Sequence, residues 1–193
     1  MIRKAYTALF MNDCYTQQIL IDRYNLYKQS YLSVVNYKQL GIPIRQQNPP
    51  EDITENIAKF IIRNYENDDS CVWCKGVGLK GDLHSSIYDI AMPIEVKSFT
   101  SNGPSQFGPN KKFGVLYFLD MREWLPNDNM KLWKVKLNSN SPEFKGIRMN
   151  KKQSHQDQCD EGRRPHISWD NLYPQIKDHC ELVYNGTFGN IFK

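Results

Sequence analysis

The segment FGVLYFLDM, residues 113–121, constrains the fold of this chain more than any other stretch. Its apolar residues are nearly continuous, which is typical of a central β-strand that is buried on both faces. Such a strand needs a sheet with structure packed against both sides. At 193 residues the chain fits one domain that can bury a core of this kind without disulfides or metals.

Helices are predicted before this strand. The first 40 residues are expected to be helical, because the segment 15–41 lacks proline and repeats apolar residues at spacings of three and four until Gly41. A second helix is predicted from Pro50, with acidic residues in its first turn. One stripe of that helix carries its apolar residues together with an asparagine: Ile53, Ile57, Phe60, Ile61 and Asn64.

Strands are predicted on both sides of residues 113–121. Short segments rich in β-branched or aromatic residues, divided by Gly, Ser or Pro, predict strands at 70–77, 79–86, 87–92 and 93–99. Residues 130–137 alternate apolar residues with lysines. Residues 168–183 are expected to open as a helix capped by Ser168, in which Pro174 must sit early or break the helix. This order predicts an α/β (α+β) fold with a central mixed β-sheet flanked by α-helices.

Two carboxylates and a lysine converge if the segments around Asp82 and Glu95 pair as strands. The two carboxylates then lie side by side, and the backbone carbonyl of Val96 adds a third oxygen of the kind that Mg²⁺ prefers. Because residues two apart in a strand share a face, Lys97 points the same way as Glu95. Its ammonium group is then placed to orient, or help deprotonate, a water that attacks a phosphate. The alternative is an ordinary hairpin with charges on its exposed face.

The sequence around these residues resembles a known nuclease superfamily. GD at 81–82 followed by IEVK at 94–97 resembles the split motif of PD-(D/E)xK nucleases. The stretch EVKSFTSNGPSQFGP is similar to the catalytic strand and following loop of small type II restriction endonucleases, and GRRPHISW is similar to their tail segments. The resemblance spans roughly residues 50–170. Gly81 stands where the superfamily name has proline, a position that varies among its members.

This resemblance implies a restriction-endonuclease-like core and a Mg²⁺-dependent enzyme, with Mn²⁺ as a possible substitute, that cuts double-stranded DNA at a short symmetric site. Asp82 and Glu95 would bind metal and Lys97 would assist the water. Several such nucleases add a glutamate from an early helix, and Glu55 is the candidate here. A helical wheel places Glu55 opposite the apolar stripe, which favours an exposed side chain, although Ala58 and Ile62 lie on the same face as Glu55, so that side is not simply polar. A cognate DNA methyltransferase is expected in the same host or virus.

Two polar segments are expected to contact DNA. Asn and Gln pair with adenine edges, Arg pairs with guanine, and lysines and hydroxyls suit phosphates. The loop after Lys97 contributes Ser98, Thr100, Ser101, Asn102, Ser105, Gln106 and Lys111. The basic segment 143–169 contributes Arg148, Lys151, Lys152, Gln153, Arg163, Arg164 and His166. The net charge of +4 permits an anionic partner without requiring one.

We expect a single nuclease domain over residues 1–193, with an N-terminal helical segment (1–41), a catalytic core (50–137) and the basic segment. No run approaches the roughly 18 apolar residues of a membrane helix, and the N-terminus carries no convincing secretory signal. Five scattered cysteines, an odd number, indicate reduced thiols and a cytoplasmic protein. The single C-x-x-C, Cys71 and Cys74, lacks a second pair at suitable spacing, which argues against zinc.

Three functions fit these observations. The favoured one is a type II restriction endonuclease, which acts as a homodimer because one site per chain must cut two strands of a twofold-symmetric target. A junction or repair nuclease would keep the same core but follow DNA structure. A non-catalytic DNA-binding protein would use the basic segment and treat Asp82, Glu95 and Lys97 as surface charges. The acidic residues argue against it, because a pure binder gains nothing from carboxylates near phosphates.

Overall fold

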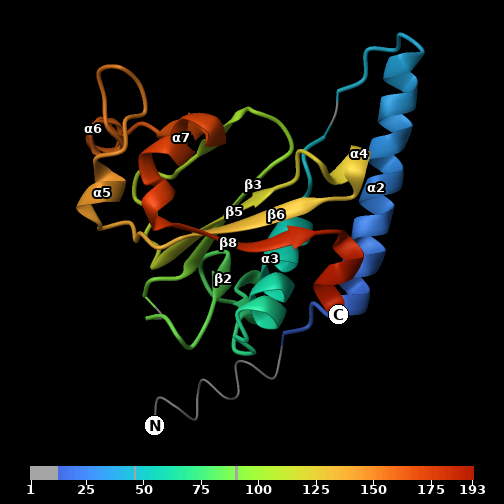
Figure 1. The fold of residues 1–193 in the computed structure, drawn as a ribbon, viewed down its shortest axis with the longest axis horizontal. Coiled ribbons are helices and arrows are strands. Elements are labelled where there is room, and N and C mark those ends of the chain that lie inside the picture. The colour runs from blue at the N-terminus through green and yellow to red at the C-terminus, as the bar shows by residue number, and fades with distance from the viewer. Residues whose placement is uncertain (1–12, 46, 90) are drawn as a thin grey trace.

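The computed structural model describes residues 13–45, 47–89 and 91–193. Its centre is a six-stranded sheet of β1 (Val72–Trp73), β2 (Leu83–His84), β3 (Ile94–Phe99), β5 (Val115–Asp120), β6 (Met130–Val135) and β8 (Cys180–Gly186), in that spatial order. Strands β3 and β5 are parallel, and each of the other neighbouring pairs is antiparallel. The predicted fold, a central mixed sheet flanked by helices, is therefore confirmed (Figure 1).

Strand β5 is the central strand that residues 113–121 predict. All of its residues are buried, and it lies between β3 and β6. Its side chains alternate between two hydrophobic clusters, with Tyr117 in one and Phe118 in the other. Each face of the sheet therefore has its own core and its own covering layer.

Helices α2 (Gln17–Gln39) and α3 (Glu51–Tyr65) cover the first face. The side chain of Thr16 caps α2 by accepting a hydrogen bond from Ile19 N, and α2 ends before Gly41, whose φ is +79°. Helix α3 begins after Pro50 as predicted, and its apolar stripe packs into the core. The part of the predicted N-terminal helix that precedes residue 13 lies outside the described residues.

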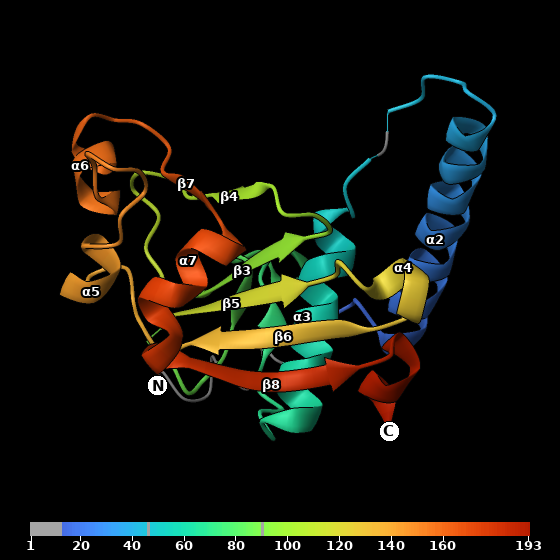
Figure 2. The ribbon, with the colours of Figure 1, turned by 45° about the horizontal axis from the view of Figure 1, so that its top comes forward.

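The second face carries the later elements. Strand β4 (Pro104–Gln106) pairs with β7 (His166–Ser168) in a separate two-stranded antiparallel sheet. Helices α5 (Pro142–Lys145), α6 (His155–Asp160) and α7 (Trp169–Ile176) accompany it, and Figure 2 shows α3 and α7 on opposite faces of the main sheet. Short elements complete the chain: α4 (Trp124–Asn127) and the 3₁₀ turns η1 (Lys75–Val77), η2 (Lys177–His179) and η3 (Phe188–Phe192).

Three local predictions are wrong. The strand predicted over residues 70–77 ends at Trp73, and Lys75–Val77 forms the 3₁₀ turn η1. Residues 87–89 and 91–92 form turns and bends instead of a strand, with Met92 N donating to Asp89 O, because they belong to the connection between β2 and β3; residue 90 lies outside the described part. In the tail, Pro174 lies inside α7, and the chain then continues into β8, which the sequence analysis missed. Strand β8 lies at the sheet edge and only Tyr184 in it is buried, so it lacks the apolar alternation that marks a half-buried strand.

Candidate active site

Asp82 stands where the chain enters β2. Leu83 pairs with Ile94 of β3, which confirms the predicted pairing and brings Asp82 beside the start of β3. Asp82 Oδ2 accepts a hydrogen bond from Val96 N at 2.9 Å. Beyond Ile94, the edge of β3 that faces away from β5 is not paired with β2. The carboxylate therefore caps a strand edge that would otherwise be open.

Gly81 allows this close approach. Its φ is +109°, a conformation that residues with a Cβ rarely adopt. A Cβ at this position would also lie 2.7 Å from Cβ of Pro93. The local backbone therefore requires glycine at this position.

Glu95 and Lys97 project from the same side of β3, as predicted. Lys97 Nζ lies 2.6 Å from Glu95 Oε1. The Glu95 side chain is 1% exposed, whereas that of Lys97 is 22% exposed. The lysine therefore connects a buried carboxylate to the solvent side of the strand.

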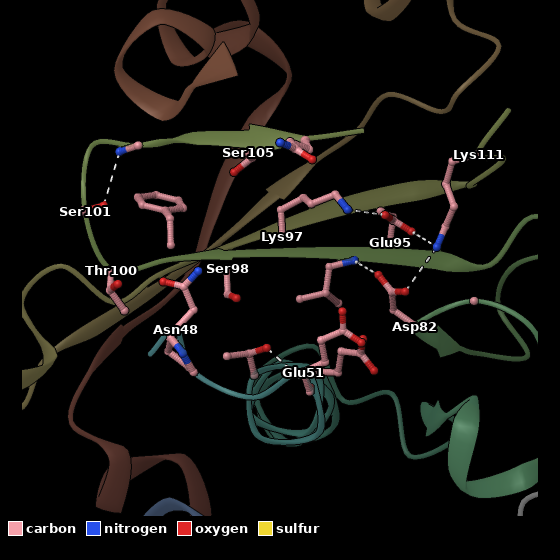
Figure 3. Close-up of a pocket in the computed structure, with 18 of the residues that line it drawn as sticks. Asn48, Glu51, Asp82, Glu95, Lys97, Ser98, Thr100, Ser101, Ser105 and Lys111 are labelled. Atoms are coloured by element: carbon pink, nitrogen blue, oxygen red, sulfur yellow. Dashed lines mark hydrogen bonds and ion pairs between the residues drawn. The ribbon is translucent and has the colours of Figure 1, made fainter. Parts of the chain in front are cut away.

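Lys111 lies between the two carboxylates (Figure 3). Its Nζ is 3.3 Å from Asp82 Oδ1 and 2.7 Å from Glu95 Oε2. The first contact is a hydrogen bond. The second is an ion pair, since Glu95 Oε2 is buried and has no hydrogen-bond partner of good geometry among the described residues. Sequence analysis predicts Lys111 as a DNA contact, and the structure places it against the acidic pair.

Glu95 and Lys111 have pKa values that their surroundings raise. Burial and the nearby charge of Asp82 raise the pKa of Glu95, and Lys97 opposes that shift. Burial alone would lower the pKa of Lys111, but Glu95 and Asp82 outweigh it and raise this pKa above its ordinary value. The ammonium groups of Lys97 and Lys111 therefore stabilise the charged form of the buried Glu95 carboxylate.

Glu55 is buried, so the expectation of an exposed side chain is wrong. Glu55 Oε2 accepts a hydrogen bond from Trp73 Nε1 at 2.6 Å, and Lys75 Nζ lies 3.4 Å from Oε1. The segment that carries Trp73 and Lys75 packs against the side of α3 on which Glu55 lies, opposite its apolar stripe. Burial raises the pKa of Glu55 to about 7, the hydrogen bond from Trp73 opposes this shift, and the charge of Asp82 adds to it.

One groove of about 800 Å³ connects these groups. It runs from the start of α3 across the open edge of β3 to the loop that follows this strand (Figure 3). Its polar lining includes Glu51, Glu55, Asp82, Glu95, Lys97, Ser98, Thr100, Ser101, Ser105, Gln106 and Lys111. The predicted catalytic residues and most of the predicted loop contacts thus face one space.

The oxygen atoms in this groove suit a hard divalent cation. In a strand the N–H and C=O of one residue point to the same side, so the carbonyl of Val96 faces the side from which Asp82 caps it. Among the described residues, no three His, Cys, Asp or Glu side chains group closely enough to hold a metal ion. A cation here would therefore use Asp82, Glu95, the Val96 carbonyl and water, an all-oxygen set suited to Mg²⁺.

The C-x-x-C segment lies beside this site, since Cys74 N donates to Asp82 O at 3.0 Å. Cys71 and Cys74 are both buried. Burial raises the pKa of Cys74 to about 12 and raises that of Cys71 further. Both are therefore protonated thiols at neutral pH.

The loop after β3 and the basic segment meet in the structure. Ser105 pairs with Ile167 and Gln106 with His166 in the β4–β7 ladder. Phe107 N also donates to Pro165 O at 2.8 Å. Two segments that the sequence analysis assigns separately to DNA therefore form one surface beside the groove.

The predicted DNA contacts of the basic segment lie outside the groove lining. Arg148, Lys151, Lys152, Arg164 and His166 are exposed. Arg163 Nη1 donates to Gln153 Oε1 at 3.0 Å and lies 3.3 Å from Glu161 Oε2. This segment supplies exposed cations near β7, while Arg163 and Gln153 are held within it.

Arg122 is a functional candidate that the sequence analysis missed. Its Nε and Nη2 donate to the two oxygens of Asp120, and its Nη1 donates to Asn102 and Asp170. It thereby joins the end of β5, the loop after β3 and the start of α7. The sequence signal is an acid two residues before an arginine at a strand end, which is too common to identify such a role from sequence.

Comparison with known proteins adds independent information. Residues 15–173 match the Bsp6I restriction endonuclease family. No curated protein and no solved structure matches the chain. Of the helices in the described ranges, none has the length and apolar content needed to cross a membrane. Because the family match covers most of the sequence, the chain belongs to the Bsp6I restriction endonuclease family and is a type II restriction endonuclease.

Proposed function

We propose that this restriction endonuclease has a PD-(D/E)xK-type, Mg²⁺-dependent site that cuts double-stranded DNA at a short symmetric sequence, with Mn²⁺ as a substitute metal. The observation that carries the proposal is the convergence of Asp82, Glu95 and Lys97 on the open edge of β3. They face a groove that the predicted DNA-contacting loop also lines.

Each residue has a defined task in this proposal. Asp82, Glu95 and the carbonyl of Val96 hold the metal, which, when bound, offsets the negative charge that develops on the phosphate. Lys97 directs its ammonium group into the groove, where it orients the attacking water and stabilises the phosphate in the transition state. Glu55 lines the same groove from α3 and adds a further carboxylate to its lining.

DNA contacts come from the surface beside the groove. Ser98, Thr100, Ser101, Ser105 and Gln106 line it and can approach the backbone and base edges. Asn102 and the exposed cations of the basic segment extend this surface, and they suit phosphates and guanine edges.

The wider setting follows from the same site. We propose one nuclease domain over residues 1–193, organised as helical segment, catalytic core and basic segment. We also propose a homodimer that presents two sites to the two strands, a cytoplasmic location, and a cognate methyltransferase that protects host DNA. Sedimentation of the protein with and without DNA tests the dimer, and a monomer in both states would contradict it.

Cleavage of unmethylated plasmid DNA with and without Mg²⁺ tests the site directly. We expect discrete fragments with a shared end sequence only when metal is present, and loss of cleavage in Asp82→Ala and Glu95→Ala. Asp89→Ala is the matched control, because this exposed aspartate lies in the same hairpin but outside the groove. Cleavage that persists in Asp82→Ala and Glu95→Ala would refute the assignment.

A further inference from the structure

Lys111 is held in a short turn between β4 and β5. Phe107 and Phe113, which flank this turn, are 2% and 1% exposed and belong to the core of the second face. Within the turn, Lys111 N donates to Gly108 O at 3.1 Å. The backbone at Lys111 is thus fixed on both sides, while its four-carbon side chain remains free to change direction.

Lys111 contacts the carboxylate oxygens of Asp82 and Glu95 that the residues of β3 do not bind. Asp82 Oδ2 is bound by Val96 N, and Glu95 Oε1 is bound by Lys97. Asp82 Oδ1 and Glu95 Oε2 remain, and the ammonium group of Lys111 bridges them at 3.3 and 2.7 Å. A cation that binds both carboxylates therefore needs the space that this ammonium occupies.

We propose that Lys111 is a built-in competitor for the metal site, which occupies it in the free enzyme and must leave before a divalent cation binds. The inference rests on the proposed function. A divalent cation between Asp82 Oδ1 and Glu95 Oε2 would take the position of the Lys111 ammonium group, and the two like charges would repel each other strongly at such short range. Lys111 is 34% exposed on its side chain and lines the groove, so it can turn outward without a change in the backbone.

Direct binding of Mn²⁺ to the DNA-free protein tests this competition. Electron paramagnetic resonance of unbound Mn²⁺ measures affinity without any cleavage reaction. We expect Lys111→Met to bind Mn²⁺ more tightly than the wild type, on the order of tenfold. The larger rise in melting temperature that Mg²⁺ then produces in Lys111→Met gives a second readout.

Matched variants separate this inference from the proposed function. Lys112→Met removes the adjacent exposed lysine, and we expect wild-type Mn²⁺ affinity. Lys111→Gln replaces Lys111→Met if the latter does not fold. Equal or weaker Mn²⁺ binding in the Lys111 variants would overturn the competition, even if Asp82→Asn abolishes binding and so supports the metal site. Unchanged binding in Asp82→Asn would instead overturn the metal site itself.

Discussion

A single missing Cβ at Gly81 sets the position of the first predicted metal ligand. In Gly81→Ala the new methyl group would clash with Pro93, and the residue would keep an unfavourable positive φ. We expect a loss of stability on the order of 2 kcal/mol and a loss of cleavage, because Asp82 moves away from Val96. Urea unfolding and plasmid cleavage measure the two effects.

Gly189→Ala is the control for this change. A methyl group added at Gly189 would meet no atom within 4 Å, and Gly189 has no positive φ. We expect little change in either stability or cleavage. If Gly81→Ala behaved like Gly189→Ala, the backbone at residue 81 would not be what positions Asp82.

His155 gives the protein a defined acid sensitivity. It is buried against Phe107 and Phe144, and burial lowers its pKa to about 4. The unfolded chain has an ordinary histidine pKa near 6.5. As the pH falls from about 6.5 towards 4, the unfolded state therefore takes up a proton that the folded state does not, and stability decreases.

His155→Phe removes this proton uptake and keeps an aromatic ring in the cluster. Between pH 7 and pH 5 we expect the wild type to lose about 2 kcal/mol more unfolding free energy than the variant. Urea unfolding at both pH values measures the difference. His166→Gln, at an exposed position, is expected to keep the wild-type loss; equal losses in His155→Phe and wild type would contradict the role of burial.

At the scale of elements, Arg122 fixes the loop after β3 relative to β5 and α7. A lysine cannot bond both oxygens of Asp120 and also reach Asn102 and Asp170. For Arg122→Lys we expect DNA binding to weaken on the order of tenfold, as for the removal of a hydrogen bond to a charged group. We also expect faster proteolysis within residues 100–103. Filter binding and limited proteolysis test these two outcomes.

Arg23→Lys is the matched control for Arg122→Lys. Arg23 also donates two hydrogen bonds to one aspartate, Asp52, but from α2 and outside the groove lining. We expect unchanged DNA affinity. Similar effects of both substitutions would show that the loss of a bidentate pair, and not the position of the loop, is responsible.

The sequence predicts those features of the elements that depend on neighbouring residues, and it misses those that depend on contacts between distant segments. The hairpin that joins Asp82 to Glu95 and the shared face of Glu95 and Lys97 follow from strand periodicity, and both are confirmed. The burial of Glu55 depends on Trp73, which a separate segment brings over α3. The placement of Lys111 depends on a turn, and no periodic pattern reports where a turn directs its side chain.

At the scale of the whole molecule, the family match leaves the restriction endonuclease as the function among the three that the sequence allowed. The resemblance of the GD and IEVK segments indicated the same class. The pairing of β4 with β7 could not be predicted, because each strand has three residues and about 60 residues separate them. Long-range pairing of such short strands is decided by the assembled core.

The exposed lysines of the basic segment are expected to contribute to DNA affinity through phosphate contacts that do not depend on sequence. Removing Lys151 and Lys152 together should weaken binding to all DNA sequences alike. It should lower the slope of log affinity against log salt by about one for each phosphate that the protein no longer neutralises. Titrations at several salt concentrations measure that slope.

Lys136→Ala is the control for these titrations. Lys136 is exposed and paired with Glu181 at the β8 edge of the sheet. We expect it to leave the slope unchanged. A slope that is also unchanged without Lys151 and Lys152 would remove the basic segment from the DNA interface.

The β4–β7 ladder has a consequence for redesigning target preference. Ser105 and Gln106 owe their positions to Ile167 and His166, which lie on the other strand. If the loop 98–106 of a relative replaced that of this enzyme, the new loop would therefore lack the β7 strand with which it pairs in the relative. With the DNA-contacting role proposed for this loop, a change of target would require the two segments to be exchanged as one unit, and natural changes in target would be expected to arise as paired substitutions across the ladder.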